Sequence, residues 1–303
     1  MLVVDRVSRS FGNLTAVRDV SFTVETGRVL GFLGPNGAGK TTTMRMLLGI
    51  YAPDSGSITW HGKRIDLAMR RRFGYLPEER GLYGKMRVRD HIAYFGRLHG
   101  LGGRTARANA DTWIETLSLG AYAGRACGEL SKGNQQKVQL ACAVVHDPEL
   151  LVLDEPFSGL DPLNAETMLD CIRLLRACGT TLVLSSHQMF ALESACDTFC
   201  IVARGEVCTR GSLAELRAAF PTRFVRVAPD LPEIRAVFTA RGTDEPLRAA
   251  DGTLRYTVPA STDFRRLLRD AVAAGPLETL EHQRPSLSQI FVRATGSAPE
   301  LEG

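Results

Sequence analysis

The amino-acid sequence predicts an α/β fold, because strongly apolar, strand-like runs alternate with stretches of helical character. Three such runs are VLGFLG (29–34), LLVLD (150–154) and TLVLSS (181–186). Continuous apolar runs of this length are typical of strands buried on both faces of a parallel sheet. Strands that alternate with helices along the chain indicate the α/β class.

The composition is ordinary for a globular protein that folds in water. Of the 303 residues, 44% are hydrophobic and 23% are charged. No apolar run approaches the ~18 residues that a membrane-spanning helix needs, and polar residues come too early in MLVVDRVSRSFG for a secretory signal. A net charge of +4 is too small to argue for nucleic acid. We expect a cytosolic chain with no nucleic-acid partner.

The seven cysteines include no CxxC pair and lie in apolar stretches. We interpret them as buried, reduced thiols, in preference to zinc ligands.

The predicted elements begin with two short strands, LVVDRVSRSF and VRDVSFTVETG, in which apolar residues alternate. The run 29–34 follows as a third strand, and KTTTMRMLLGI as a helix. Residues 90–119 carry the apolar spacing of helices.

Beyond about residue 212 the pattern loosens, which indicates a domain boundary near 212–220. The segment 223–293 predicts a small α+β unit: strand FVRVA, a helix at 232–241, strand LRYTV and a helix at 262–274. We expect a first domain over 1–215, a small C-terminal α+β domain over 216–296, and a frayed tail over 297–303.

The stretch GPNGAGKTT (34–42) has the spacing of a P-loop, Gly34-x4-Gly39-Lys40-Thr41. Glycines let backbone N–H groups wrap phosphates, a lysine neutralises the β- and γ-phosphates, and a threonine hydroxyl binds Mg²⁺. A preceding apolar strand and a following helix support the motif. The predicted nucleotide contacts are Gly34, Pro35, Asn36, Gly37, Ala38, Gly39, Lys40, Thr41 and Thr42.

Two carboxylates end the apolar strand at 150–154. Asp154 is a candidate Mg²⁺ ligand, and Glu155 a candidate general base that polarises the attacking water. Alone, the pair would be interpreted as capping the next element, but the P-loop favours the chemical role. His187, after the strand at 181–186, is a candidate sensor of the γ-phosphate, although a lone histidine there is more often structural.

A second anion site is predicted in ELSKGNQQKVQ (129–139), where a small polar cluster precedes a helical run. A helix start leaves unpaired N–H groups and a partial positive charge. The chain thus carries two phosphate-binding surfaces.

Together, GPNGAGKTT, LSKGNQQ, LLVLDEP, SGLD (158–161) and SSHQ (185–188) resemble the motifs of ABC transporter ATP-binding subunits, in that family's order. The resemblance covers residues 1 to about 215. It implies a P-loop NTPase domain with an antiparallel β subdomain and a helical subdomain, ATP and Mg²⁺ as ligands, and ATP hydrolysis.

The resemblance also explains the two anion sites. In the family two subunits stack head to tail, so that the signature of one closes on the ATP of the other. Ser131 and Gly133 match the signature residues that meet the γ-phosphate, and Asp161 matches the residue that couples the two sites. Phe11 stands where the family stacks an aromatic ring on adenine; the alternative is a core phenylalanine.

One position departs from the family pattern. Glu78, after FGYLP (73–77), replaces the glutamine that usually touches Mg²⁺ and the attacking water. A carboxylate can still bind the metal, but it adds negative charge near the γ-phosphate.

YLPEERGLYGKM (75–86) and RPSLSQIFVRAT (284–295) look like the branch of bacterial sodium-export ATPases, which has an extra C-terminal domain. The resemblance implies an exporter subunit, peripheral on the cytoplasmic face of the inner (plasma) membrane. Its partners would be a separate integral membrane permease and a second ATPase subunit. Leu82, Tyr83 and Met86 are candidates for the permease contact, or for simple packing.

Two other classes of function stay open. One is a soluble ABC ATPase of DNA repair or translation, although the chain has one cassette and no dense basic run. The other is a nucleotide-binding module without turnover.

Overall fold

The structure is a computed structural model that describes residues 1–296, except residues 80, 187, 242, 244 and 250. Its described residues form two compact units: Met1–Leu213 with residues 291–296, and Ala214–Ile290. The division falls within two helices, α8 (Leu213–Ala218) and α11 (Leu287–Thr295).

The first unit is built on a six-stranded sheet in the order β10-β9-β3-β8-β7-β6. Five strands run parallel and the edge strand β10 is antiparallel to β9. The strands are β3 (Val29–Leu33), β6 (Phe73–Leu76), β7 (Leu150–Asp154), β8 (Thr181–Ser185), β9 (Thr198–Ala203) and β10 (Glu206–Gly211). The three apolar runs of the sequence are β3, β8 and β7, side by side and buried at every residue. The predicted α/β fold is confirmed.

A second, antiparallel sheet has the order β2-β1-β4-β5. Its strands are β1 (Leu2–Phe11), β2 (Leu14–Val24), β4 (Ser55–Trp60) and β5 (Lys63–Arg64). The ring of Phe22 on β2 lies 5.4 Å from that of Phe32 on β3, and both belong to one hydrophobic core. This is the antiparallel subdomain that the resemblance implies.

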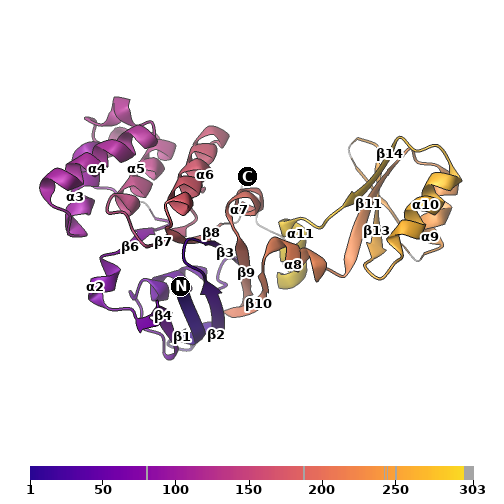
Figure 1. The fold of residues 1–303 in the computed structure, drawn as a ribbon, viewed down its shortest axis with the longest axis horizontal. Coiled ribbons are helices and arrows are strands. Elements are labelled where there is room, and N and C mark those ends of the chain that lie inside the picture. Colours follow the sequence, from indigo (N-terminus) through magenta and orange to yellow (C-terminus); the bar gives the residue numbers. More distant parts are fainter. Residues whose placement is uncertain (80, 187, 242, 244, 250, 297–303) are drawn as a thin grey trace. The chain divides into compact units, whose positions relative to one another are not determined.

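Helices follow the strands of the parallel sheet, and α3, α4 and α5 group together as a helical subdomain (Figure 1). Gly96 on α3 permits the close packing, because a Cβ there would lie 3.2 Å from Ala106 of α4 and 3.4 Å from Val145. The helices are α1 (Lys40–Leu47), α2 (Leu67–Arg70), α3 (Val88–Leu98), α4 (Gly103–Thr116), α5 (Lys132–Val144), α6 (Pro162–Ala177) and α7 (Met189–Ala195), with short 3-10 turns at Gly120–Tyr122 and Cys127–Glu129.

The second unit follows the order strand, helix, strand, strand, helix, strand. Its elements are β11 (Thr222–Ala228), α9 (Pro232–Thr239), β12 (Leu247–Arg248), β13 (Leu254–Pro259), α10 (Phe264–Ala274) and β14 (Thr279–Gln283). The sheet order β12-β13-β11-β14 is that of a ferredoxin-like fold. Phe238 of α9 stacks on Tyr256 of β13, with ring centroids 4.0 Å apart. The second unit contains the expected strands and helices, together with β12, β14 and the first residues of α11. The bounds 216–296 stay a prediction.

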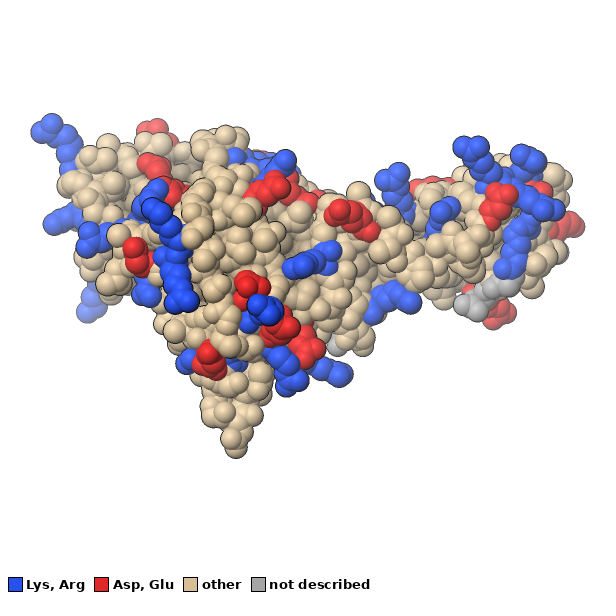
Figure 2. Space-filling view, turned by 60° about the horizontal axis from the view of Figure 1, so that its bottom comes forward, with Lys and Arg blue, Asp and Glu red and all other residues tan. Residues whose placement is uncertain are grey.

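Charged side chains of both signs are interspersed over the face drawn in Figure 2, and much of that face is uncharged. Many arginines are paired: Arg226, for example, contacts Asp251 and Glu281.

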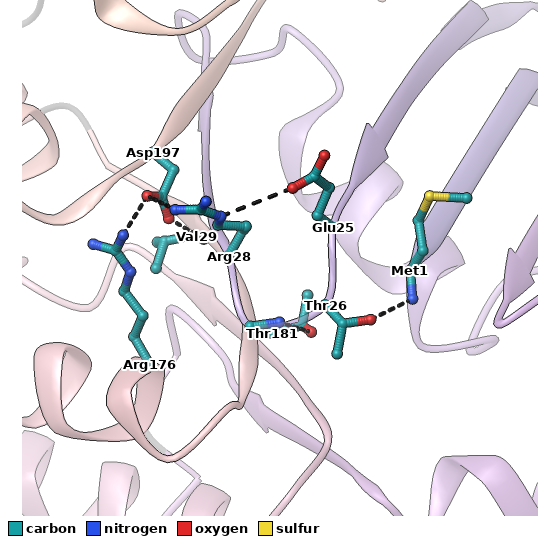
Figure 3. Close-up of polar contacts among 9 residues, drawn as sticks. Met1, Glu25, Thr26, Arg28, Val29, Arg176, Thr181 and Asp197 are labelled. Atoms are coloured by element: carbon teal, nitrogen blue, oxygen red, sulfur yellow. Dashed lines mark hydrogen bonds and ion pairs between the residues drawn. The ribbon is translucent and has the colours of Figure 1, made fainter.

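A polar cluster joins β3, α6 and β9 at the start of the parallel strands (Figure 3). Asp197 accepts from the backbone N–H of Val29 at 2.9 Å and from Arg28 at 3.1 Å, and also pairs with Arg176. Because this carboxylate is largely buried, it holds the start of β3 against β9 by charge-assisted bonds.

The cysteines differ in part from the prediction. Cys127, Cys142, Cys171 and Cys200 are buried, but Cys178 and Cys208 are exposed. Cys178 follows the last residue of α6 and Cys208 lies on the edge strand β10. Apolar neighbours along the chain did not reveal that both positions lie at the margin of the unit.

His91 on α3 is fully buried, with the rings of Phe95 and Tyr83 at 5.1 and 5.6 Å. Neither ring nitrogen has a hydrogen-bond partner among the described residues. Burial lowers the pKa of His91 to about 4, so the ring is neutral in the folded chain at pH 7.

We expect His91→Phe to reduce the loss of stability in acid. The unfolded chain binds a proton at His91 below a pKa of about 6.5, whereas the folded chain resists it down to about 4. Stability from this group is therefore complete above pH 6.5 and is lost as the pH falls toward 4. The free energy of unfolding, measured with urea at several pH values from 7 to 4.5, should fall less steeply with decreasing pH in the variant than in the native chain. An unchanged slope would contradict this assignment.

Candidate functional site

The P-loop joins β3 to α1 and is held by two close backbone contacts. A Cβ on Gly34 would lie 2.6 Å from the carbonyl oxygen of Val202 on β9, and one on Gly39 would lie 2.4 Å from that of Ala16 on β2. Gly39 also has φ +93°, a left-handed conformation. Only glycine fits at either position, because the loop backbone packs directly against the backbone of β9 and β2.

The start of α1 supplies the positive charge of the loop. Lys40 is the first residue of α1, and its Nζ donates to the carbonyl oxygens of Gly34 at 2.7 Å and Pro35 at 3.4 Å. Gly39, at the N-cap, makes no side-chain cap. The ammonium group and the first N–H groups of the helix thus converge on the loop, an arrangement that binds phosphate.

A cavity of about 680 Å³ opens over this loop. It is lined by Phe11, Leu14, Thr15, Ala16, Asn36, Gly37, Ala38, Gly39, Lys40, Thr41, Thr42, Glu78, Asp154, Glu155 and Arg204. Residues from five separate parts of the sequence meet there, and most of the expected nucleotide contacts are among them. Leu14, Thr15, Ala16 and Arg204 were not foreseen, because no motif marks them.

Asp154 is buried at the end of β7, where parallel pairing places it opposite Ser185 of β8. Its Oδ1 accepts from the Ser185 hydroxyl at 2.7 Å, and its Oδ2 is buried with no hydrogen-bond partner among the described residues. A buried carboxylate oxygen without a hydrogen-bond partner is suited to bind Mg²⁺. Ser185 was also missed from the sequence.

Glu155 is buried and has φ +51°, which is strained for a residue with a side chain. Its backbone N–H donates to the carbonyl oxygen of Ser185 at 3.2 Å and to its hydroxyl at 3.1 Å. The sharp turn after Asp154 places the Glu155 carboxylate in the lining of the cavity.

Glu78 lies on the exposed segment after β6 and lines the same cavity. Its pKa is raised above the usual value, first by loss of solvent and then by the carboxylates of Asp154 and Glu155. Within the described part of the chain, no three His, Cys, Asp or Glu side chains form a metal site by themselves. A Mg²⁺ ion here would take further ligands from Thr41 and from the phosphates.

Phe11, the last residue of β1, has 40% of its surface exposed and borders the cavity. Its ring packs edge-on against Tyr51, with centroids 5.4 Å apart, and the Arg9 guanidinium lies 5.0 Å from the ring. An aromatic ring held at the cavity edge suits stacking on a base.

The second anion cluster lies outside this cavity lining. Ser131 caps α5 by accepting from the N–H of Asn134, and a Cβ on Gly133 would lie 2.6 Å from the side-chain nitrogen of Asn164. That nitrogen donates to Asp161 at 2.6 Å. The pKa of Asp161 is lowered, chiefly by the backbone N–H of Asn164. The fold thus brings Ser131, Gly133 and Asp161 together, while His187 lies outside the described residues.

A glycine-rich loop with a lysine at the start of the following helix, and a buried carboxylate at the end of β7 in the same parallel sheet, define a P-loop nucleotide-binding protein.

The family model described as "ABC transporter" matches residues 17–158. The protein named "Uncharacterized ABC transporter ATP-binding protein YhaQ" of Bacillus subtilis (strain 168) is 38% identical over 300 residues, 99% of this chain and 100% of that protein. "Nod factor export ATP-binding protein I" of Rhizobium sp. (strain N33) is 33% identical over 298 residues, 97% and 96% of the two chains. A solved "Structure of ATP binding subunit of ABC transporter" matches with a TM-score of 0.67 and 32% identity, over 72% of this chain and 92% of that one.

The chain belongs to the family of ABC transporter ATP-binding proteins, and the resemblance seen in its motifs is confirmed. It is the ATP-binding subunit of an ABC transporter, with an ABC ATPase domain.

Gly39→Ala should destabilise the protein more than Gly37→Ala, by about 1–3 kcal/mol. Both glycines have positive φ, but a Cβ on Gly37 meets nothing within 4 Å, whereas one on Gly39 meets backbone at 2.4 Å. Urea unfolding without nucleotide measures the difference. Equal losses for the two variants would show that φ alone matters.

Glu78→Gln should raise the melting temperature in Mg²⁺-free buffer, and more at pH 7.5 than at pH 4. The raised pKa means that ionised Glu78 costs stability. This cost is absent when the pH is below the usual pKa of about 4.3 and grows as the pH rises through the folded value. Glu115→Gln, an exposed change of equal charge on α4, is the control. An equal gain in both variants at both pH values would exclude carboxylate repulsion in the cavity.

Proposed function

We propose that this chain hydrolyses Mg²⁺-ATP and so drives a separate membrane permease, as the motor of an exporter. The observation that supports this best is the separation of two phosphate-binding clusters. The cavity holds the P-loop with Asp154 and Glu155, while Ser131, Gly133 and Asp161 cluster outside its lining. A second ATPase subunit could bring its own Ser131 and Gly133 to the open side of that cavity.

In the proposed reaction, Lys40 and the loop N–H groups hold the β- and γ-phosphates, while Thr41, Asp154 and Glu78 hold Mg²⁺. Glu155 accepts a proton from a water molecule while the oxygen of that water attacks the γ-phosphorus. The bond from that phosphorus to the β,γ-bridging oxygen breaks, which leaves ADP and phosphate. Phe11 would stack on the adenine.

Closure of two subunits would complete each site. Ser131 and the Gly133 N–H of the second subunit would then stabilise the charge on the γ-phosphate, in place of an arginine finger. Asp161, linked to Gly133 through Asn164, would couple one site to the other. We propose that His187 takes part as the γ-phosphate sensor. ATP would favour the closed dimer, and hydrolysis would reopen it.

A mostly apolar groove supports docking of a permease. It encloses about 410 Å³, and Leu82, Phe95 and Tyr75 are among its lining residues. Gln139 of α5 also lines the groove and donates to the carbonyl oxygens of Pro77 and Glu79 at 3.0 Å each. A partner seated there would contact the segment that carries Glu78. The exposed ring of Tyr83 and Met86 would extend this surface.

The exporter role follows from the branch resemblance and from the relative named for Nod factor export. Among the described residues, no helix is both long and apolar enough to cross a bilayer, so the permease is proposed as a separate chain. We place the subunit on the cytoplasmic face of the inner (plasma) membrane. In this proposal residues 1–215 form the ATPase and 216–296 an accessory domain.

Glu155→Gln should trap an ATP-dependent dimer, because ATP would bind without being cleaved. Size-exclusion chromatography with light scattering should show the dimer only with Mg²⁺-ATP. The double variant Lys40→Ala/Glu155→Gln is the control and should stay monomeric. The proposed closure of two subunits would be contradicted if Glu155→Gln binds ATP but stays monomeric, both in solution and when membranes are present.

Affinity purification of the tagged chain from detergent-solubilised membranes should recover a polytopic membrane protein in near-equal amount. Mass spectrometry identifies it, and substitution of Leu82 by Glu should reduce its recovery several-fold while Lys40-dependent ATP hydrolysis remains. Recovery of only ribosomal or DNA-bound proteins would overturn the transport role and leave the ATPase standing.

A further inference from the structure

An arginine that no motif marks borders the nucleotide cavity. Arg204 lies in the turn between β9 and β10, with φ +53°, and Gly205 follows with φ +81°. A Cβ on Gly205 would lie 2.8 Å from the carbonyl oxygen of Ala16 on β2, and Gly205 accepts a hydrogen bond from the N–H of Arg18 at 2.8 Å. The turn is therefore fixed against β2.

The same carbonyl of Ala16 also meets the P-loop. It is the atom that a Cβ on Gly39 would approach to 2.4 Å. The carbonyl group of Ala16 therefore lies between the Arg204–Gly205 turn and Gly39, the residue that precedes Lys40. Strand β9 itself runs beside the loop, since Val202 on it packs against Gly34. Arg204 is consequently placed beside the loop by backbone contacts.

Among the described residues, Arg204 has no partner of opposite charge. Its side chain is exposed and makes no ion pair or hydrogen bond to another described residue. Its neighbour Arg18, by contrast, pairs with Glu206 at 3.5 Å. A guanidinium at the border of a phosphate-binding cavity is suited to a phosphate oxygen, which it can meet with two parallel N–H donors.

The surroundings of the turn suggest which phosphate Arg204 would meet. In the proposed placement of ATP, Phe11 holds the base and Lys40 the β- and γ-phosphates. Leu14 to Ala16 follow Phe11 in the chain and line the same cavity as Arg204, and the carbonyl of Ala16 meets both Gly39, next to Lys40, and Gly205, next to Arg204. Between the base and the β-phosphate a nucleotide carries a ribose and the α-phosphate, and only the latter is charged. We propose that Arg204 binds the α-phosphate of the nucleotide. This inference rests on the proposed placement of ATP, with its base on Phe11.

The test compares Arg204→Gln with Arg18→Gln. The control removes the same charge from a residue that contacts Gly205 but does not line the cavity. Gln keeps the positive φ strain of position 204 the same, so melting temperatures without nucleotide should stay close to that of the native chain. The dissociation constants of ATP and of ADP are measured by displacement of a fluorescent nucleotide, at 50 and 300 mM salt.

We expect Arg204→Gln to weaken ATP and ADP alike, by roughly 3- to 10-fold at 50 mM salt and less at 300 mM. Arg18→Gln should change neither, and Arg204→Lys should fall between. A change below twofold at low salt, or a change for ATP but not for ADP, would overturn the inference. If instead the native chain binds no ATP, or Lys40→Ala binds as well as native, the proposed nucleotide site itself fails.

Discussion

The close packing of the P-loop backbone against two other strands is the constraint on which the rest of this structure depends. Gly34 meets a carbonyl of β9 and Gly39 meets a carbonyl of β2, at distances that leave no room for a side chain. The loop can therefore hold its phosphate-binding shape only if the antiparallel sheet and β9 are both in place. The cluster around Asp197, which bonds the start of β3 to the start of β9, supports the same junction from the opposite end of the strands.

Parallel pairing then arranges the chemistry at the carboxyl ends of the central strands. Because Asp154 and Ser185 are opposite one another, one serine orients the carboxylate and also holds the backbone of Glu155 in its strained turn. Negative charge accumulates there, since Glu78, Asp154 and Glu155 border one cavity. Lys40 lines the same cavity, and the proposed Mg²⁺ would offset the remaining negative charge, including that of Glu78.

The helical subdomain links this centre to the surfaces that are proposed to meet other chains. Helix α5 begins at the Ser131 and Gly133 cluster, and further along it Gln139 bonds to the segment around Glu78. One helix thus contacts both the cluster of Ser131 and Gly133 and the groove at Leu82. In the proposed function, this helix would carry movement between the second ATPase subunit and the permease.

The sequence by itself determined the parallel strands, the P-loop and the two carboxylates after β7, because these depend on local pattern: continuous apolar runs, glycine spacing and a strand end. It also indicated the helix start at Ser131. Only the tertiary structure decided that Ser185 holds Asp154 and that Arg204 borders the cavity, because both come from strands far away in sequence. The same is true of β12 and β14 in the second unit, whose short and largely polar sequences become strands through pairing with β13 and β11. Cys178 and Cys208 are exposed because they lie at the margin of the first unit. The residues next to them in the sequence do not indicate this position.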